Sequence, residues 1–215
     1  MQKLLTATSA LALVAGLLAA APAYADPVTV NNYSFETLPA GGLTNLCGGT
    51  CAYSIGAVPD WSVTGTTGEW VMGGFVGNPP AIDGSTIGWS NNGSISQGVA
   101  TAVDGTTYTL QVDLLHRTDV AMAGEVQLEI GGVVVATATG VDGGAGTWSD
   151  WTAVYTASGA DAGQEVTILL SDNGTGQGDY DNVRLDASTS VPEPASLALL
   201  GVSLVGLGLL RRKHA

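Results

Sequence analysis

The sequence predicts one all-β domain, an antiparallel β-sandwich, with a hydrophobic segment at each end of the chain. Apolar residues alternate with polar ones over short segments, glycine-rich turns separate these segments, and no convincing amphipathic helix is visible. The chain has 215 residues, of which 31 are glycine, 12% are charged and 45% are hydrophobic. That hydrophobic fraction excludes a chain kept unfolded by its own charge.

The first 25 residues have the three parts of a secretory signal peptide. Lys3 supplies a positive charge, an apolar run covers residues 11–21, and Ala-Tyr-Ala at 23–25 forms a small-residue cleavage site. We expect a signal helix over 1–25 that signal peptidase removes, and export to an oxidising compartment.

The C-terminal segment, residues 189–215, carries a second sorting signature. It contains the motif Pro192-Glu193-Pro194 and, near its end, the basic residues Arg211, Arg212 and Lys213. The largely apolar stretch 195–210 lies between them and predicts a hydrophobic helix. At about 24 Å such a helix is short for a membrane core of about 30 Å, but it spans with local thinning. The basic tail would stay cytoplasmic.

This combination of motif, apolar helix and basic tail resembles the PEP-CTERM sorting signal of Gram-negative bacteria. The resemblance implies transient anchoring in the inner membrane, processing by an exosortase, and release to the cell surface or an extracellular exopolysaccharide matrix. We therefore expect the secreted protein to lack the segment from about Glu193 onward.

The predicted domain, residues 26–188, is acidic and has very few basic residues. Between Asp26 and Ser190 there are two basic residues, Arg117 and Arg184, and 18 carboxylates, which gives a net charge of −16. Contacts with phosphates need clustered lysine or arginine, so nucleic-acid binding is excluded. Attachment to anionic lipid through a basic patch is excluded for the same reason.

The alternation is clearest in two segments near the middle of the domain. Every second residue is apolar from Tyr108 to Leu114 and from Val126 to Ile130. Gly131 and Gly132 then precede a β-branched run at 133–135, which predicts a hairpin. Further strands are expected at 61–63, 70–72, 82–89, 94–99, 152–156, 166–170 and 180–185.

The stretch from Thr37 to Asp60 shows no strand pattern and contains both cysteines. Connections longer than about 15 residues are usually functional or stapled. In an exported protein, Cys47 and Cys51 are expected to form a disulfide. A redox or metal site is the alternative, but redox catalysis prefers a Cys-x-x-Cys spacing in a βαβ setting.

Few residues of the domain suit catalysis. His116 is the only histidine between residues 26 and 190, so a zinc site built on several histidines is excluded. Ser54 echoes a nucleophile elbow, but that motif needs a strand before it and a helix after it. No two carboxylates stand out as a glycosidase pair. We therefore predict no catalytic residue, with a polysaccharide-active hydrolase or lyase as the less favoured alternative.

Four short motifs mark the domain from its beginning to its end. They cover residues 32–36 (NYSFE), 94–97 (SISQ), 105–110 (GTTYTL) and 179–183 (DYDNV). Their order resembles that of galactose-binding-domain-like jelly rolls, which include the DUF642 plant cell-wall proteins and several carbohydrate-binding module families. The resemblance implies a jelly-roll β-sandwich whose first and last strands are neighbours.

The same resemblance implies a structural calcium ion bound by Glu36 and Asp181. Ca²⁺ takes six to eight hard oxygen ligands, and an acidic chain benefits from a buried dication. The alternative is that Glu36 caps a stretch of backbone and Asp181 makes a turn.

The aromatic residues favour glycan binding, because the C–H patches of sugar rings stack on indole faces. Trp70, Trp89 and Trp148 adjoin glycine-rich turns and are the candidate ligand-binding residues, whereas Trp61 and Trp151 are expected in the core. We therefore predict a non-catalytic module that binds an extracellular polysaccharide. The alternative is a structural matrix or surface protein without glycan binding.

Overall fold

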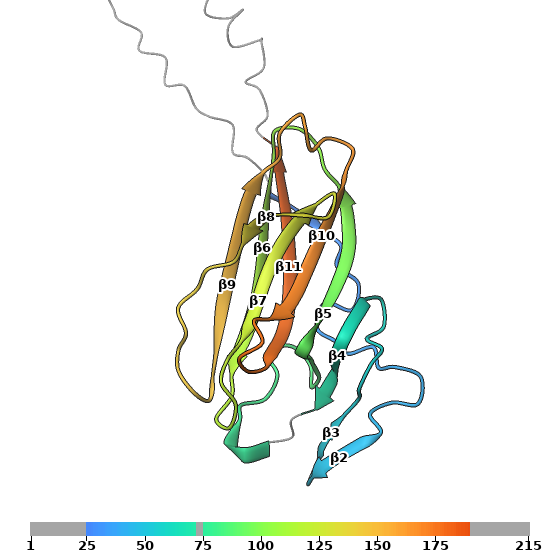
Figure 1. Cartoon of the computed structure of the whole chain (residues 1–215), viewed down its shortest axis with the longest axis vertical. Helices are drawn as coiled ribbons and strands as arrows, with labels where there is room; N and C mark the ends of the chain where they lie inside the picture. Colours follow the sequence, from blue (N-terminus) through green and yellow to red (C-terminus); the bar gives the residue numbers. More distant parts are fainter. Residues whose placement is uncertain (1–24, 72–74, 190–215) are drawn as a thin grey trace, which may run out of the picture. The chain divides into compact units, whose positions relative to one another are not determined.

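The computed structural model describes residues 25–71 and 75–189, which form an all-β antiparallel domain (Figure 1). The strands are β1 (Ala25–Val28), β2 (Asn45–Gly48), β3 (Cys51–Tyr53), β4 (Ser62–Val71), β5 (Ile87–Thr101), β6 (Thr106–His116), β7 (Gly124–Ile130), β8 (Val133–Thr137), β9 (Thr147–Thr156), β10 (Glu165–Asp172) and β11 (Gly178–Thr189). A single turn of 3-10 helix, η1 (Phe75–Gly77), lies between β4 and β5. The antiparallel all-β fold class is confirmed.

The two predicted sorting segments lie outside the described residues, together with the signal helix and the C-terminal hydrophobic helix expected there. Within residues 25–71 and 75–189, the structure has no helix of sufficient length and apolarity to cross a membrane.

The strands pair in two connected groups. One group follows the order β2-β3-β4-β5-β10-β7-β8, and the other joins β9, β6, β11 and β1. The first residues of β11 pair with β5, from Gly178 to Tyr180, and the rest of the strand pairs with β6 and β1. The β1–β11 pairing confirms that the first and last strands are neighbours. The pairing of β11 with β5 makes β11 the strand that joins the two groups (Figure 1).

The main core is mainly aliphatic, with a few buried aromatic rings such as those of Phe35 and Tyr180, and it follows the alternation of the sequence. Side chains on successive positions of a strand point to opposite faces, so every second residue of β6, β7 and β10 is buried. Its fully buried members include Leu110, Leu114, Leu128, Ile168 and Leu170. Each such side chain contributes about 1.5–3 kcal/mol when it leaves water.

The predicted glycine turn and the disulfide are both confirmed. Gly131 and Gly132 have φ angles of 59° and 77° between β7 and β8, a conformation that the two central residues of a type I′ hairpin require. Cys47 and Cys51 are bonded to each other across the β2–β3 hairpin.

Several expected strand boundaries are wrong. The predicted strands 61–63 and 70–72 overlap one strand, β4, and the predicted strands 82–89 and 94–99 overlap one strand, β5. The segment 82–86 does not continue β5, because the N–H groups of Ile82 and Asp83 donate to Asp181 Oδ2 at 2.7 and 3.0 Å instead of to a neighbouring strand. The stretch from Thr37 to Asp60 was expected to lack strands, yet it contains β2 and β3. These strands are only four and three residues long, too short for a visible alternation.

Candidate functional site

A second apolar cluster lies apart from the main core and is built largely of aromatic side chains. Its buried members are Cys51, Trp70, Ile87, Trp89 and Leu115, and Cys47, Tyr53, Phe75, Ala81 and Trp148 pack against them. We call this group the aromatic cluster. It contains all three tryptophans that the sequence singled out as ligand-binding candidates.

The register of β4 and β5 explains why two of these tryptophans meet. Trp70 pairs with Ile87, and Trp89 pairs with Gly68, so the two indoles stand on one face as diagonal neighbours. The Cβ that any other residue would add at Gly68 would lie 2.9 Å from the Trp89 Nε1 atom. A glycine at this position therefore leaves room for the Trp89 ring.

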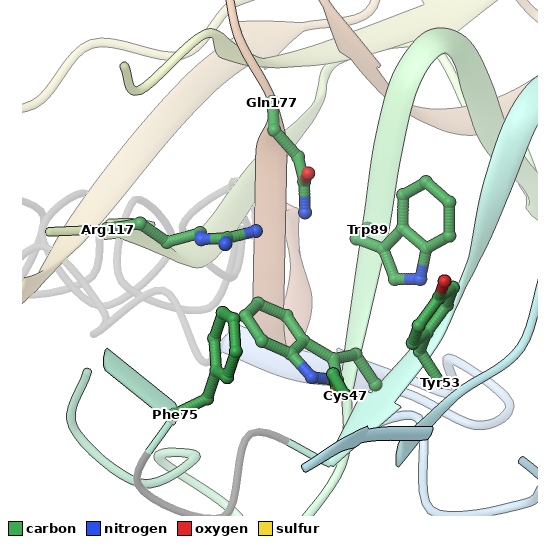
Figure 2. Close-up of a pocket in the computed structure, with 7 residues that line it drawn as sticks. Cys47, Tyr53, Phe75, Trp89, Arg117 and Gln177 are labelled. Carbon is green, nitrogen blue, oxygen red and sulfur yellow. The ribbon is translucent and has the colours of Figure 1, made fainter. Parts of the chain in front are cut away.

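A pocket of about 220 Å³ opens in the aromatic cluster (Figure 2). Its lining residues are Cys47, Tyr53, Trp70, Phe75, Trp89, Arg117 and Gln177. The volume lies below the roughly 300–1,000 Å³ that is typical of pockets for drug-sized ligands. A small ring system therefore suits the pocket better than a polymer segment does.

The tryptophans form walls of the pocket instead of an open platform. Trp70 and Trp89 are only 4% and 7% exposed. Tyr53 meets the Trp89 ring edge-on at 6.4 Å, and Phe75 meets the Trp70 ring edge-on at 5.8 Å. Trp148 does not line the pocket, and its Nε1 donates to the Pro80 carbonyl at 2.9 Å.

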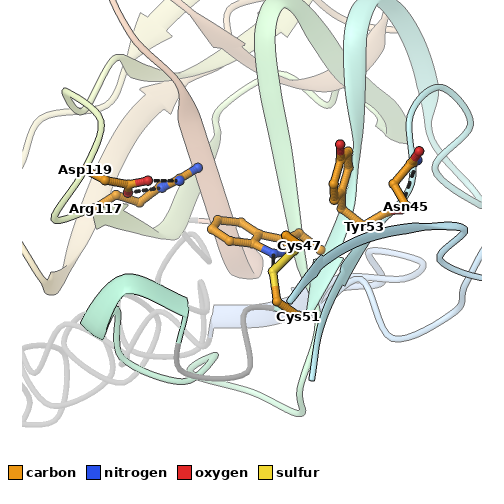
Figure 3. Close-up of a disulfide and its surroundings, with 7 residues drawn as sticks. Asn45, Cys47, Cys51, Tyr53, Arg117 and Asp119 are labelled. Carbon is orange, nitrogen blue, oxygen red and sulfur yellow. Dashed lines mark hydrogen bonds and ion pairs between the residues drawn. A yellow bond between two sulfur atoms is a disulfide. The ribbon is translucent and has the colours of Figure 1, made fainter. Parts of the chain in front are cut away.

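Arg117 brings a buried positive charge to the pocket. It follows the end of β6, is 8% exposed, and places its guanidinium carbon 4.4 Å from the centre of the Trp70 ring. Its Nε and Nη2 atoms donate to the two Asp119 carboxylate oxygens at 2.9 and 2.6 Å. Figure 3 shows this ion pair on one side, Tyr53 on the other, and the disulfide between them. A buried charge is costly unless it is paired, and Asp119 meets that need.

Asp179 is a buried acid beside the pocket. It is 1% exposed and is the register partner of Trp89, so the two side chains start from opposite positions on neighbouring strands. Gln177, which lines the pocket, donates its Nε2 to Asp179 Oδ1 at 2.8 Å. Burial raises the pKa of Asp179 to about 7, although the nearby Arg117 charge and the Gln177 hydrogen bond oppose the rise. Near neutral pH this carboxyl group is poised to exchange a proton.

One polar atom of the pocket wall is left without a partner. Trp89 Nε1 is buried and has no hydrogen-bond acceptor within the described parts of the chain. Buried donors in native proteins are nearly always satisfied by protein or by ordered water. This N–H is one of the unsatisfied buried donors of the described residues, and it lies against the backbone at Gly68.

Glu36 and Asp181, the residues predicted to bind calcium, hold the same loop. Glu36 Oε1 accepts the N–H groups of Ser85 and Thr86 at 2.7 and 2.6 Å, and Asp181 Oδ2 accepts those of Ile82 and Asp83. These contacts match the backbone-capping alternative for Glu36.

Across the described ranges, no three His, Cys, Asp or Glu side chains are grouped to hold a metal. The calcium site stays a prediction, which a thermal melt compared in EDTA and in added calcium tests. A midpoint that calcium raises and EDTA lowers would support it, and identical melts would contradict it.

Neither His116 nor Ser54 builds a catalytic triad here. His116 Nδ1 lies 2.9 Å from Asp142 Oδ2 at the end of β6. Ser54 Oγ accepts the N–H of Glu69 at 2.9 Å, and a loop follows it where a nucleophile elbow would need a helix.

Sequence reasoning missed five residues beside the pocket. They are Tyr53, Phe75, Arg117, Gln177 and Asp179. Arg117 had a recognisable signal, since it is one of two arginines in the domain and directly follows a strongly apolar strand.

Fold and site together define a class of protein: a small antiparallel β-domain with a partly open aromatic pocket and a buried acid beside it. A family model described as HpiC1-like, HpiC1 cyclase, matches residues 26–186, so the chain belongs to the HpiC1-like family. The PEP-CTERM protein-sorting motif matches residues 190–213 and confirms the predicted sorting signal. The protein is therefore exported and sorted to the cell surface, and its motif implies processing by an exosortase.

Several solved structures are similar to this chain. The crystal structure of the Stig cyclase Fisc from Fischerella sp. TAU, in complex with (3Z)-3-(1-methyl-2-pyrrolidinylidene)-3H-indole, is 21% identical with a TM-score of 0.63, over 78% of this chain and 100% of that one. A second cyclase structure from Fischerella sp. TAU is 19% identical with a TM-score of 0.63, over 79% and 100%. The CBM22-1 xylan-binding domain from Paenibacillus barcinonensis Xyn10C is 10% identical with a TM-score of 0.45, over 80% and 100%. A search of curated proteins gives no match.

Proposed function

We propose that the pocket binds a small planar aromatic compound and that Asp179 donates a proton to it in an acid-catalysed ring closure. One observation carries this proposal: Asp179 is the register partner of Trp89 and accepts a hydrogen bond from Gln177, and both of these residues line a largely aromatic pocket. The ring of the ligand would lie against Trp70 or Trp89, where burial and stacking both favour binding.

The proton transfer is balanced within the pocket. The O–H bond of protonated Asp179 breaks, a C–H bond forms on the ligand, and the ligand becomes a cation. Indole faces stabilise such a cation through their ring quadrupole. After ring closure, the ligand loses a proton back to the Asp179 carboxylate, so substrate and product are isomers.

The descriptions of similar proteins support this choice of chemistry. The family model is described as a cyclase, and the Fisc structure holds an indole derivative. An aromatic ligand and a ring-forming reaction are consistent with both.

Glycan binding, predicted from the sequence, is the second candidate. The observation that favours it is the gathering of Tyr53, Trp70 and Trp89 around one pocket, since sugar rings stack on such faces. In that case the domain would be non-catalytic, as the sequence analysis expects. A structural role in the matrix without any ligand is the third.

Calorimetric titration of the secreted protein with an indole and with soluble oligosaccharides separates these functions. We expect the indole to bind and the oligosaccharides to give no heat. Trp89→Ala should abolish indole binding, and Trp148→Ala, outside the pocket, should leave it intact. Saturable binding of an oligosaccharide but not of the indole would establish the glycan module. A panel of alkenyl-substituted indoles, screened for products of unchanged mass, then tests for catalysis.

A further inference from the structure

Arg117 retains hydrogen-bonding capacity that the protein does not use. A guanidinium group has five N–H donors in a fixed planar fork. Asp119 takes one from Nε and one from Nη2, and the remaining three have no acceptor in residues 25–71 and 75–189. Arg117 is more than nine-tenths buried and lines the pocket, so the edge of its guanidinium group that carries these three N–H donors is available to a ligand there. We call this the free edge.

The surroundings of Arg117 hold this edge in place. Stacking on the Trp70 ring fixes the guanidinium plane, and the two bonds to Asp119 fix its rotation within that plane. Figure 2 shows the side chain entering the pocket opposite Tyr53 and Trp89. A ligand ring that contacts those aromatic residues would bring a short substituent to the guanidinium.

We propose that the ligand is an aromatic acid whose planar carboxylate binds the free edge of the Arg117 guanidinium while its ring packs between the aromatic walls. This inference rests on the proposed function and specifies its substrate class. A carboxylate suits the fork because its two oxygens accept two parallel N–H bonds. In its protonated form, Asp179 adds no negative charge that would repel the carboxylate.

The test compares indole-3-acetate with its neutral amide, indole-3-acetamide, by calorimetry on the secreted protein at pH 6. We expect the wild type to bind the acetate about tenfold more tightly than the acetamide, because charge-assisted bidentate bonds are strong. Arg117→Met should bind both probes equally. Arg184→Met is the matched control: it removes the other arginine of the domain, whose partners Asp113 and Asp150 lie outside the pocket lining, and should keep the preference.

A second variant keeps the test decisive if Arg117→Met fails to fold. Asp119→Asn removes the carboxylate that shares the guanidinium charge, and it should increase the preference for the acetate. Equal binding of the two probes to the wild type would overturn the inference and leave the proposed function standing. Binding of neither probe would overturn the proposed function as well. Inorganic phosphate and the acetate ion are then compared as competitors of indole-3-acetate. If phosphate displaces the probe at a concentration at which the acetate ion does not, the choice of a carboxylate ligand is overturned.

Discussion

The two apolar clusters of this domain differ in the charged groups beside them. The main core is mainly aliphatic, with Leu110, Leu128 and Ile168 fully buried, and it also encloses the rings of Phe35 and Tyr180. The aromatic cluster includes a disulfide and borders a buried arginine and a buried acid. Each cluster has one indole N–H without an acceptor among the described residues, Trp89 Nε1 in the aromatic cluster and Trp151 Nε1 beside the main core.

The difference separates a region organised for stability from one organised for binding. Buried charged groups lower the stability of a fold, and natural proteins keep such features mainly at functional sites. The aromatic cluster is therefore the part of the domain where substitutions should change activity more than they change folding. The following predictions test that separation.

The largest effect is expected from Asp179→Asn. The amide keeps the shape of the side chain but has no acidic proton, so turnover should fall by about 100-fold or more. The melting temperature should not fall, because the variant removes a carboxylate that burial disfavours in its ionised form. Asp186→Asn, on the same strand but paired with Thr109 of β6 instead of with Trp89 of β5, is the control. Unchanged turnover in Asp179→Asn would remove Asp179 from the mechanism.

A pair of substitutions compares the clusters directly. Leu128→Ala opens a cavity in the main core and should cost about 2–5 kcal/mol of unfolding free energy, which lowers the melting temperature by roughly 5–15 °C. Phe75→Ala, at the partly exposed edge of the pocket, should cost much less and should weaken ligand binding. Thermal melts and calorimetric titrations of both variants measure the two effects. If Leu128→Ala weakened ligand binding and Phe75→Ala caused the larger loss of stability, the main core and the aromatic cluster would not differ in role.

The main core was predictable from the sequence because one local signal determines it. Period-two alternation sets both the strand and its buried face, so β6, β7 and β10 were located within one or two residues. The loop 82–86 broke this rule, since its apolar Ile82 donates its N–H to Asp181, 99 residues further along the chain. No local pattern carries that information.

The pocket was only partly predictable for the same reason. Trp70 and Trp89 were found through their neighbouring glycine turns, and the register of β4 and β5 brings them together. Arg117 and Gln177 come from the ends of other strands, and sequence alone does not state which strand ends meet. The acidity of Asp179 depends on burial, which is a property of the assembled fold.

Stability should fall as pH rises through the range from about 4 to 7. Burial is the largest cause that raises the pKa of Glu69, Asp179 and Asp181 to about 7. Between the unfolded pKa values and 7, the unfolded chain has released these protons and the folded chain still holds them, so stability declines with pH. We expect a progressive loss of stability between pH 5 and pH 7.5, visible as a lower melting temperature.

Glu69→Gln should weaken this pH dependence, because Glu69 is fully buried and its Oε2 has no hydrogen-bond partner in the described chain. Asp119, Asp142 and Asp161 have lowered pKa values, and their contributions change below about pH 4, outside this window. Melts of equal midpoint at pH 5 and pH 7.5 would contradict the buried-acid description of the site.

The smallest effect is expected from the disulfide. It contributes both to folding and to the pocket, because it stabilises the fold and its Cys47 lines the pocket. Replacing Cys47 and Cys51 together by alanine should cost about 2 kcal/mol, since the bond closes a loop of only five residues. The Trp70 indole N–H, which donates to Cys51 Sγ at 3.0 Å, also loses its acceptor. Ligand affinity should therefore fall beyond what the modest loss of stability explains, as measured by calorimetry at a temperature where both proteins are folded. Unchanged affinity would show that the disulfide contributes to stability alone and that the binding region does not extend beyond the Trp70 ring.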